Sequence, residues 1–147
     1  MSNAIEGPML ERIGQLIADI LPDHDAEGAW MYAEAGDQWV SASIFKDEGE
    51  TLRCWFASTD LVYAILKLWE AQRDAGNEWA VLIYAIEEGR FEARFQYPED
   101  IDPAEDSIER RPHALAERFG DKPVIYPKMG KDRFYQPTLD ELIAPDD

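Results

Sequence analysis

The chain has 147 residues, of which 14 are lysine or arginine and 31 are aspartate or glutamate, so its formal charge is −17. The length corresponds to one domain, and a hydrophobic content of 46% argues against a disordered acidic chain. The charge disfavours binding to nucleic acid or to anionic membranes. The single cysteine, Cys54, cannot form an internal disulfide, and the composition predicts a cytoplasmic protein.

The N-terminal part of the sequence predicts a short leader followed by a helix. Residues 1–8 are expected to be a disordered N-terminus or a remnant of cloning, to which Ser2-Asn3-Ala4 points. Pro8 suits the first turn of a helix, and apolar residues then recur at spacings of three and four from Leu10 to Leu21. We expect this helix to end at Pro22.

The next segments have the period of β-strands. Residues 29–35 and 38–45 flank Gly36-Asp37, which is typical of a two-residue hairpin turn. An acidic turn follows, and residues 52–56 form the third strand of an antiparallel meander.

A second helix and two further strands complete the predicted sheet. Ser58 or Thr59 can cap the helix, which ends at Gly76. Residues 79–86 are apolar on both faces, as in a central strand. Residues 90–97 alternate between apolar and polar, as in a half-buried strand.

The remainder predicts one more helix and an irregular tail. The helix begins at Asp106 or Ser107 and ends at Gly120, and the prolines beyond it indicate an irregular tail over residues 127–147. The order α-βββ-α-ββ-α predicts a single α+β domain over residues 9–126. We expect an antiparallel sheet of about five strands with the helices packed on one face.

No motif of catalysis or cofactor binding is present in the sequence. There is no glycine-rich phosphate loop, no pair of cysteines and no nucleophile elbow. Cys54 lies inside a predicted strand, where a free cysteine is usually a small apolar filler. We therefore predict a protein that is not an enzyme, with no catalytic residues, no cofactor and no metal.

Residues 23–34 offer an alternative, because they partly match a calcium-binding EF-hand loop. Asp23, Asp25, Glu27 and Glu34 occupy loop positions 1, 3, 5 and 12, and Gly28 occupies position 6. The loop must exit into a helix, however, whereas this segment continues into a strand pattern. Calcium binding is therefore the less favoured hypothesis.

Two further groups of residues have an expected place. The five tryptophans are expected mainly in the core, with one or two as surface anchors, and Trp39, close to a hairpin turn, is the first candidate for an anchor. Arg110 and Arg111 are isolated positive charges, and we expect them to pair with neighbouring acids at little net gain.

The order of elements, together with several segments, resembles the YezG-like immunity proteins. The segments are Ser58-Thr59-Asp60, Leu68-Trp69-Glu70-Ala71-Gln72, the strand opened by Trp79, the run from Gly89 to Tyr97, and Arg110-Arg111 before Phe119-Gly120. The resemblance covers about residues 9–126. It implies a small α+β bacterial protein of the cytoplasm that binds and occludes the toxic C-terminal domain of a cognate toxin, commonly a nuclease, without catalysis.

The charge is consistent with such a partner, because an acidic surface can cover the basic surface of a nuclease. The candidate partner-binding residues are three clusters of acids in predicted turns and loops: Asp47, Glu48 and Glu50; Glu87 and Glu88; Glu99, Asp100, Asp102, Glu105 and Asp106. An acidic protein-binding adaptor or a nucleic-acid mimic is the alternative function. A homodimer through an edge strand is compatible with each of these functions.

Overall fold

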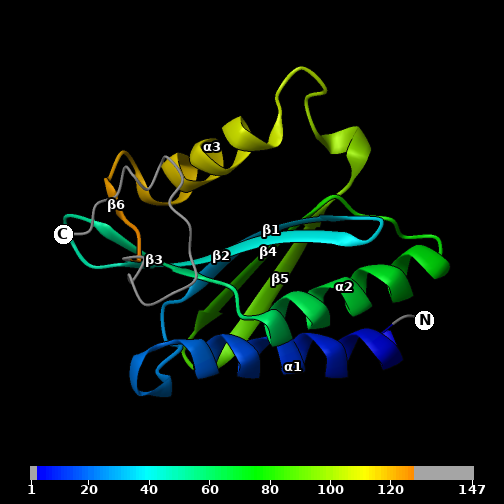
Figure 1. The fold of residues 1–147 in the computed structure, drawn as a ribbon, viewed down its shortest axis with the longest axis horizontal. Coiled ribbons are helices and arrows are strands. Elements are labelled where there is room, and N and C mark those ends of the chain that lie inside the picture. The colour runs from blue at the N-terminus through cyan, green and yellow to red at the C-terminus, as the bar shows by residue number, and fades with distance from the viewer. Residues whose placement is uncertain (1–2, 128–147) are drawn as a thin grey trace.

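A computed structural model of the chain describes residues 3–127. The helices are α1 (Asn3–Ile20), α2 (Thr59–Asp74) and α3 (Ser107–Phe119), with short 3-10 turns at η1 (Pro22–His24) and η2 (Pro98–Asp100). The strands are β1 (Trp30–Gly36), β2 (Trp39–Asp47), β3 (Leu52–Phe56), β4 (Val81–Glu87), β5 (Arg90–Gln96) and β6 (Val124–Ile125). They form one sheet in the order β5-β4-β1-β2-β3-β6 (Figure 1), antiparallel except between β3 and β6. The predicted α+β class and element order are confirmed.

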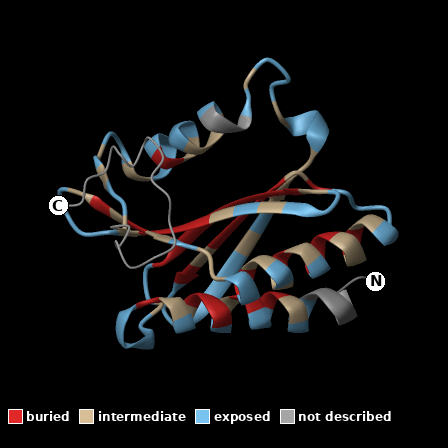
Figure 2. Cartoon of the chain, viewed as in Figure 1, coloured by how far each residue is buried: buried red, intermediate tan, exposed pale blue. Residues whose placement is uncertain are grey.

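The larger apolar core lies between the sheet and the pair of helices α1 and α2. The predicted stripe on α1 points inward, and Ile13 and Ile17 are fully buried. Ser58 caps α2 by accepting a hydrogen bond from the Leu61 backbone at 3.2 Å. Figure 2 shows the buried residues on the sides of both helices that face the sheet.

Helix α1 begins earlier than the sequence predicts. It starts at Asn3, within the segment expected to be disordered over residues 1–8, and Pro8 lies inside it. Pro8 is the sixth residue of this helix, so its missing N–H removes one hydrogen bond within the helix close to its start. The predicted tail of residues 127–147 falls outside the described residues apart from Pro127.

The prediction that all helices share one face of the sheet is wrong for α3. This helix lies on the face opposite α1 and α2 (Figure 1). It covers a second apolar layer that includes Trp30, Tyr32 and Ile83. Its Leu115 is buried, and its Phe119 ring meets the Trp30 ring edge-on at 5.5 Å. Strands β1 and β4 are apolar on both faces, so both faces need a cover.

The turn between β1 and β2 lies one residue later than predicted. Gly36 pairs with Trp39 as the last residue of β1, which leaves Asp37 and Gln38 to form the turn. A Cβ at Gly36 would lie 2.3 Å from Nε1 of Trp39. Glycine is therefore needed here to admit the indole ring.

Strand β6 was not predicted. Val124 and Ile125 pair in parallel with Leu52 and Arg53, and the Pro123 carbonyl accepts a hydrogen bond from the Leu52 N–H at 2.9 Å. A strand of two residues is too short to show an alternating pattern in the sequence. It covers the edge of β3.

Gly14 lies on α1 directly against the hydroxyl group of Tyr84. A Cβ at this position would be 2.6 Å from the hydroxyl oxygen and 3.6 Å from the ring carbon Cζ. The Tyr84 ring has little room to withdraw, because it is fully buried and stacks on Phe91 at 5.1 Å. Its hydroxyl also donates to the Leu10 carbonyl at 2.6 Å.

We expect Gly14→Ala to lower the free energy of unfolding by about 1–3 kcal/mol through overpacking. This loss opposes the roughly 1 kcal/mol by which helices favour alanine over glycine. In a Tyr84→Phe background the clashing oxygen is absent, so the same substitution should be neutral or stabilising. Urea unfolding of the four proteins measures the difference. An equal cost in both backgrounds would show that Tyr84 does not constrain position 14.

Candidate functional site

Helix α3 is anchored to the sheet by a buried ion pair between Arg110 and Glu34. The Arg110 guanidinium donates two hydrogen bonds to the Glu34 carboxylate, from Nε at 3.0 Å and from Nη2 at 2.9 Å. Tyr32, on the same face of β1, donates its hydroxyl to this carboxylate at 2.8 Å. Glu34 is only 4% exposed and the Arg110 side chain is 21% exposed, so this bidentate pair is largely shielded from water and strong.

The contacts with Glu34 also affect the protonation of Arg110 and Tyr32. Hydrogen bonding to the Glu34 side chain raises the pKa of Arg110 above its ordinary value. Burial raises the pKa of Tyr32, and the hydrogen bond to Glu34 raises it further. Arg110 therefore stays charged and Tyr32 stays neutral across the physiological range of pH.

The expected pairing with acids is confirmed for Arg110, although its partner is distant in the sequence, and it is wrong for Arg111, which forms no ion pair among residues 3–127. Arg110 pairs with an acid 76 residues away in the sequence, and Arg111 donates to the Ser43 hydroxyl on β2 at 3.1 Å. Sequence reasoning missed Glu34 and Tyr32 as partners. The available signal was a glutamate within an otherwise apolar strand, which needs a cationic partner once it is buried.

The first two predicted clusters of acids lie at one end of the sheet, which we call the turn end. The β2–β3 and β4–β5 turns meet there, because Trp30 pairs with both Phe45 and Ala85. Three of the five acids form ion pairs within the chain: Asp47 with Lys122 at 2.7 Å, Glu48 with Arg53 at 3.0 Å, and Glu87 with Arg118 at 3.0 Å. The hydrogen bond from Lys122 lowers the pKa of Asp47. Most of the charge at the turn end is therefore compensated internally.

The third cluster lies at the opposite end of the sheet, in the loop between β5 and α3 (residues 97–106), which we call the acidic loop (Figure 1). Asp100, Asp102 and Asp106 accept hydrogen bonds from backbone N–H groups, which shape the loop without neutralising it. Glu105 contacts His113. Among residues 3–127, no lysine or arginine forms an ion pair with any of the five acids of this loop.

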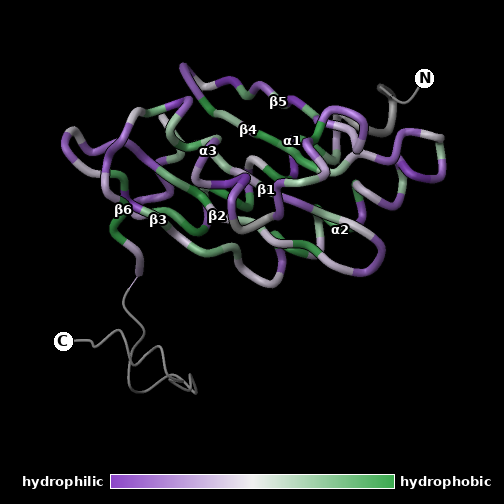
Figure 3. Tube along the Cα trace, turned by 90° about the horizontal axis from the view of Figure 1, so that it is seen from above, coloured by the Kyte–Doolittle hydropathy of each residue, from purple (hydrophilic) through white to green (hydrophobic). Residues whose placement is uncertain are grey.

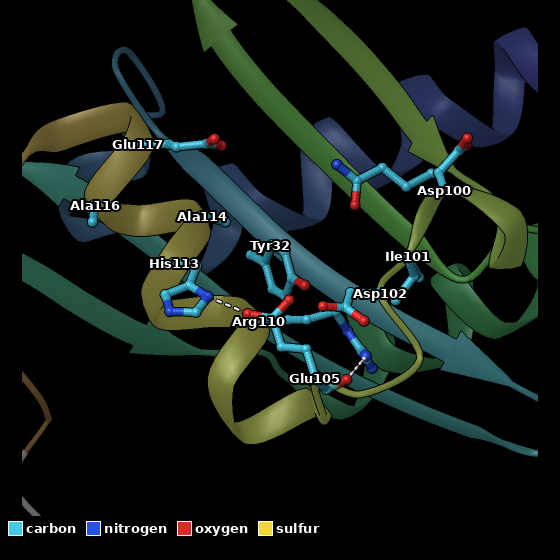
Figure 4. Close-up of a pocket in the computed structure, with 11 residues that line it drawn as sticks. Tyr32, Asp100, Ile101, Asp102, Glu105, Arg110, His113, Ala114, Ala116 and Glu117 are labelled. Carbon is cyan, nitrogen blue, oxygen red and sulfur yellow. Dashed lines mark hydrogen bonds and ion pairs between the residues drawn. The ribbon is translucent and has the colours of Figure 1, made fainter.

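A cavity of about 580 Å³ lies between the acidic loop, α3 and the sheet. In Figure 4, Asp102, Glu105 and Arg110 gather close to Tyr32, whereas Asp100 and Glu117 lie farther from this group. The charge of Arg110 is already matched by Glu34. The wall that remains is acidic, so the cavity suits a cationic group.

The calcium-loop hypothesis for residues 23–34 is wrong in its geometry. The segment exits into β1, and Glu34 binds Arg110 on the α3 side of the sheet. The Glu27 carboxylate instead accepts hydrogen bonds from the backbones of Glu88 and Gly89, at 2.8 and 3.4 Å. Across the described part of the chain, no group of three or more His, Cys, Asp or Glu side chains could hold a metal ion.

Cys54 is a buried residue of β3, with 1% of its surface exposed. Burial raises the pKa of its thiol to about 11, so the nucleophilic thiolate is scarce at neutral pH. We expect a thiol reagent to label the native protein at least about 100-fold more slowly than the protein unfolded in urea. Equal rates in the two states would contradict the burial of this side chain.

Trp39 is a surface residue, as predicted, with 48% of its area exposed. It lies at the same end of the sheet as the acidic loop, and its place opposite Gly36 puts it on the face that α3 covers. Trp30, Trp69 and Trp79 are buried. An exposed tryptophan at the same end of the sheet as the acidic loop adds an aromatic group to the charge available there.

The sequence matches no known family model and no curated protein. Within residues 3–127, no helix combines the length and apolar character needed to cross a membrane.

Proposed function

We propose that this chain is an immunity protein, which binds the toxic C-terminal domain of a cognate bacterial toxin and occludes its working surface. The observation that carries the proposal is the acidic loop, because among residues 3–127 its carboxylates form no ion pair with lysine or arginine and only Glu105 contacts a histidine, His113. The proposed partner presents a basic surface, as a nuclease domain does, and the inhibition requires no chemistry by the chain.

The two ends of the sheet differ in what they offer to such a partner. At the turn end a basic partner would compete with Lys122, Arg53 and Arg118 for the same carboxylates. At the acidic loop no lysine or arginine of residues 3–127 competes, so the carboxylates other than Glu105, which contacts His113, contribute fully to the field that steers a cationic protein. The candidate acids therefore fall into a compensated and an uncompensated group, and Glu99, Asp100 and Asp102 become the leading contacts.

Two further features at this end of the sheet offer contacts to a partner in addition to the charge of the acidic loop. The cavity next to Asp102 has room for a lysine or arginine side chain of the partner. Trp39 provides an exposed aromatic ring at the same end of the sheet. Central aromatic residues surrounded by polar groups are typical of energetically important contacts.

The proposal is tested by titrating the activity of the toxin domain that the tagged chain retains from its host. Occlusion predicts that inhibition is complete at one chain per toxin domain, and that full activity returns when the complex is separated in high salt. Permanent inactivation, or inactivation of many toxin molecules by one chain, would contradict binding without chemistry. Equal affinity for several unrelated basic proteins would instead favour an acidic adaptor or a nucleic-acid mimic.

A further inference from the structure

Strand β5 forms an open edge of the sheet. Among the described residues no strand lies beyond it, and Figure 3 shows it at the margin of the molecule beside the more hydrophobic β4. The Gln96 carbonyl accepts a hydrogen bond from Ala80, so this residue uses its backbone toward the preceding strand. Because successive residues of a strand alternate, Phe91, Ala93 and Phe95 direct their N–H and C=O groups outward. An edge of this kind is a template for pairing with another strand.

The sequence of β5 is complementary to itself when two copies run antiparallel. With Ala93 opposite Ala93 of a second copy, Glu92 lies opposite Arg94 of that copy, and Arg94 lies opposite its Glu92. Phe91 and Phe95 face each other on the opposite side of the sheet in the same register. The outward groups of Phe91, Ala93 and Phe95 can then form about six N–H···O bonds across the two-fold axis.

The charges on β5 are available for this pairing. Glu92 and Arg94 lie on the α3 side of the sheet, opposite Ala85 and Ile83. Within residues 3–127, neither of them nor Arg90 forms an ion pair. Phe91 keeps 38% of its area exposed although its ring stacks on Tyr84. The strand has two arginines and one glutamate, so its net charge is positive, whereas the net charge of the whole chain is negative.

We propose that the chain forms a two-fold symmetric homodimer through β5, in which the two sheets join with Ala93 at the axis. We assign a second copy of the chain to this edge because Glu92 and Arg94 lie opposite each other's charges when two β5 strands run antiparallel. A strand of any other protein would need this pattern by coincidence. The proposal is independent of toxin binding, which rests on the acidic loop and not on Glu92 or Arg94.

Sedimentation velocity of the full chain over about 5–500 μM tests the dimer, since an interface made mainly by one strand pair is small and weak. We expect the mass to rise with concentration from 16.8 kDa toward twice that value. Glu92→Arg and Arg94→Glu each place like charges opposite one another twice, so each should weaken dimerisation by about tenfold or more. The double variant Glu92→Arg/Arg94→Glu restores opposite charges and should dimerise like the parent chain.

Two results of this experiment would overturn the proposed dimer. A chain that stays monomeric at every concentration overturns the proposal. A dimer that both single variants and the double variant leave unchanged also overturns it, because another surface then makes the contact. Thermal melts of the variants verify folding, and the exposed positions of both side chains predict little change. As a second probe, Ala93→Pro removes an outward N–H, which edge strands tolerate, and should abolish the dimer.

Discussion

Arg110→Met is expected to lower the free energy of unfolding by about 3–5 kcal/mol, a cost typical of removing one partner from a buried ion pair. The substitution keeps most of the length and apolar stem of the side chain but leaves the Glu34 carboxylate enclosed without a cation. Glu34 is 4% exposed, so its carboxylate would lose its cationic partner in a largely desolvated position. Urea unfolding at neutral pH measures the loss.

Two controls separate the missing charge from general damage to α3. Glu34→Gln combined with Arg110→Met removes both charges while an amide oxygen still accepts from the Tyr32 hydroxyl, so most of the stability should return. Arg111→Met removes one hydrogen bond, to Ser43, and should cost only about 1 kcal/mol. If Arg110→Met remained within 1 kcal/mol of the parent, the ion pair would not anchor the helix.

Neutralising the acidic loop is expected to slow association with a basic partner by about tenfold or more at low salt. The variant Glu99→Gln/Asp100→Asn/Asp102→Asn removes three negative charges. Its amide oxygens can still accept the backbone hydrogen bonds from Tyr97 and Ala104 that shape the loop. Stopped-flow or surface-based kinetics against the purified toxin domain measure the association rate.

A matched variant at the turn end separates local from overall charge. Asp47→Asn/Glu48→Gln/Glu87→Gln removes the same number of charges, and each of the three is already compensated by Lys122, Arg53 or Arg118. We expect this variant to slow association less than about threefold. The difference between the variants should shrink as added salt shortens the screening length. Equal effects would indicate that net charge, and not the acidic loop, guides the partner.

The fold was largely predictable because its main signals are local. The alternation over residues 90–97 gave β5, and a single hydroxyl at Ser58 gave the start of α2. The position of α3 was not predicted, although the strand of residues 79–86, apolar on both faces, required a second cover. The prediction placed Gly36 in the turn, because glycine is common in turns. Its contact with the Trp39 ring, which leaves no room for a Cβ, can be seen only in the structure.

The candidate site was less predictable, because it depends on which charges the topology brings together. All three clusters of acids look equivalent in the sequence. Lys122 and Arg118 neutralise the turn end only because α3 and the segment after it return there. The pair of Glu34 and Arg110 joins residues 76 positions apart, and no local pattern encodes such a contact.

The most direct test of the proposed function is affinity capture from the native host with three tagged baits: the parent chain, the neutralised acidic loop and the matched turn-end variant. We expect the parent and the turn-end variant to retain one toxin through its C-terminal domain at low and moderate salt, and the acidic-loop variant to lose it. Retention of the same protein by all three baits, or of many unrelated basic proteins by the parent, would contradict the proposal.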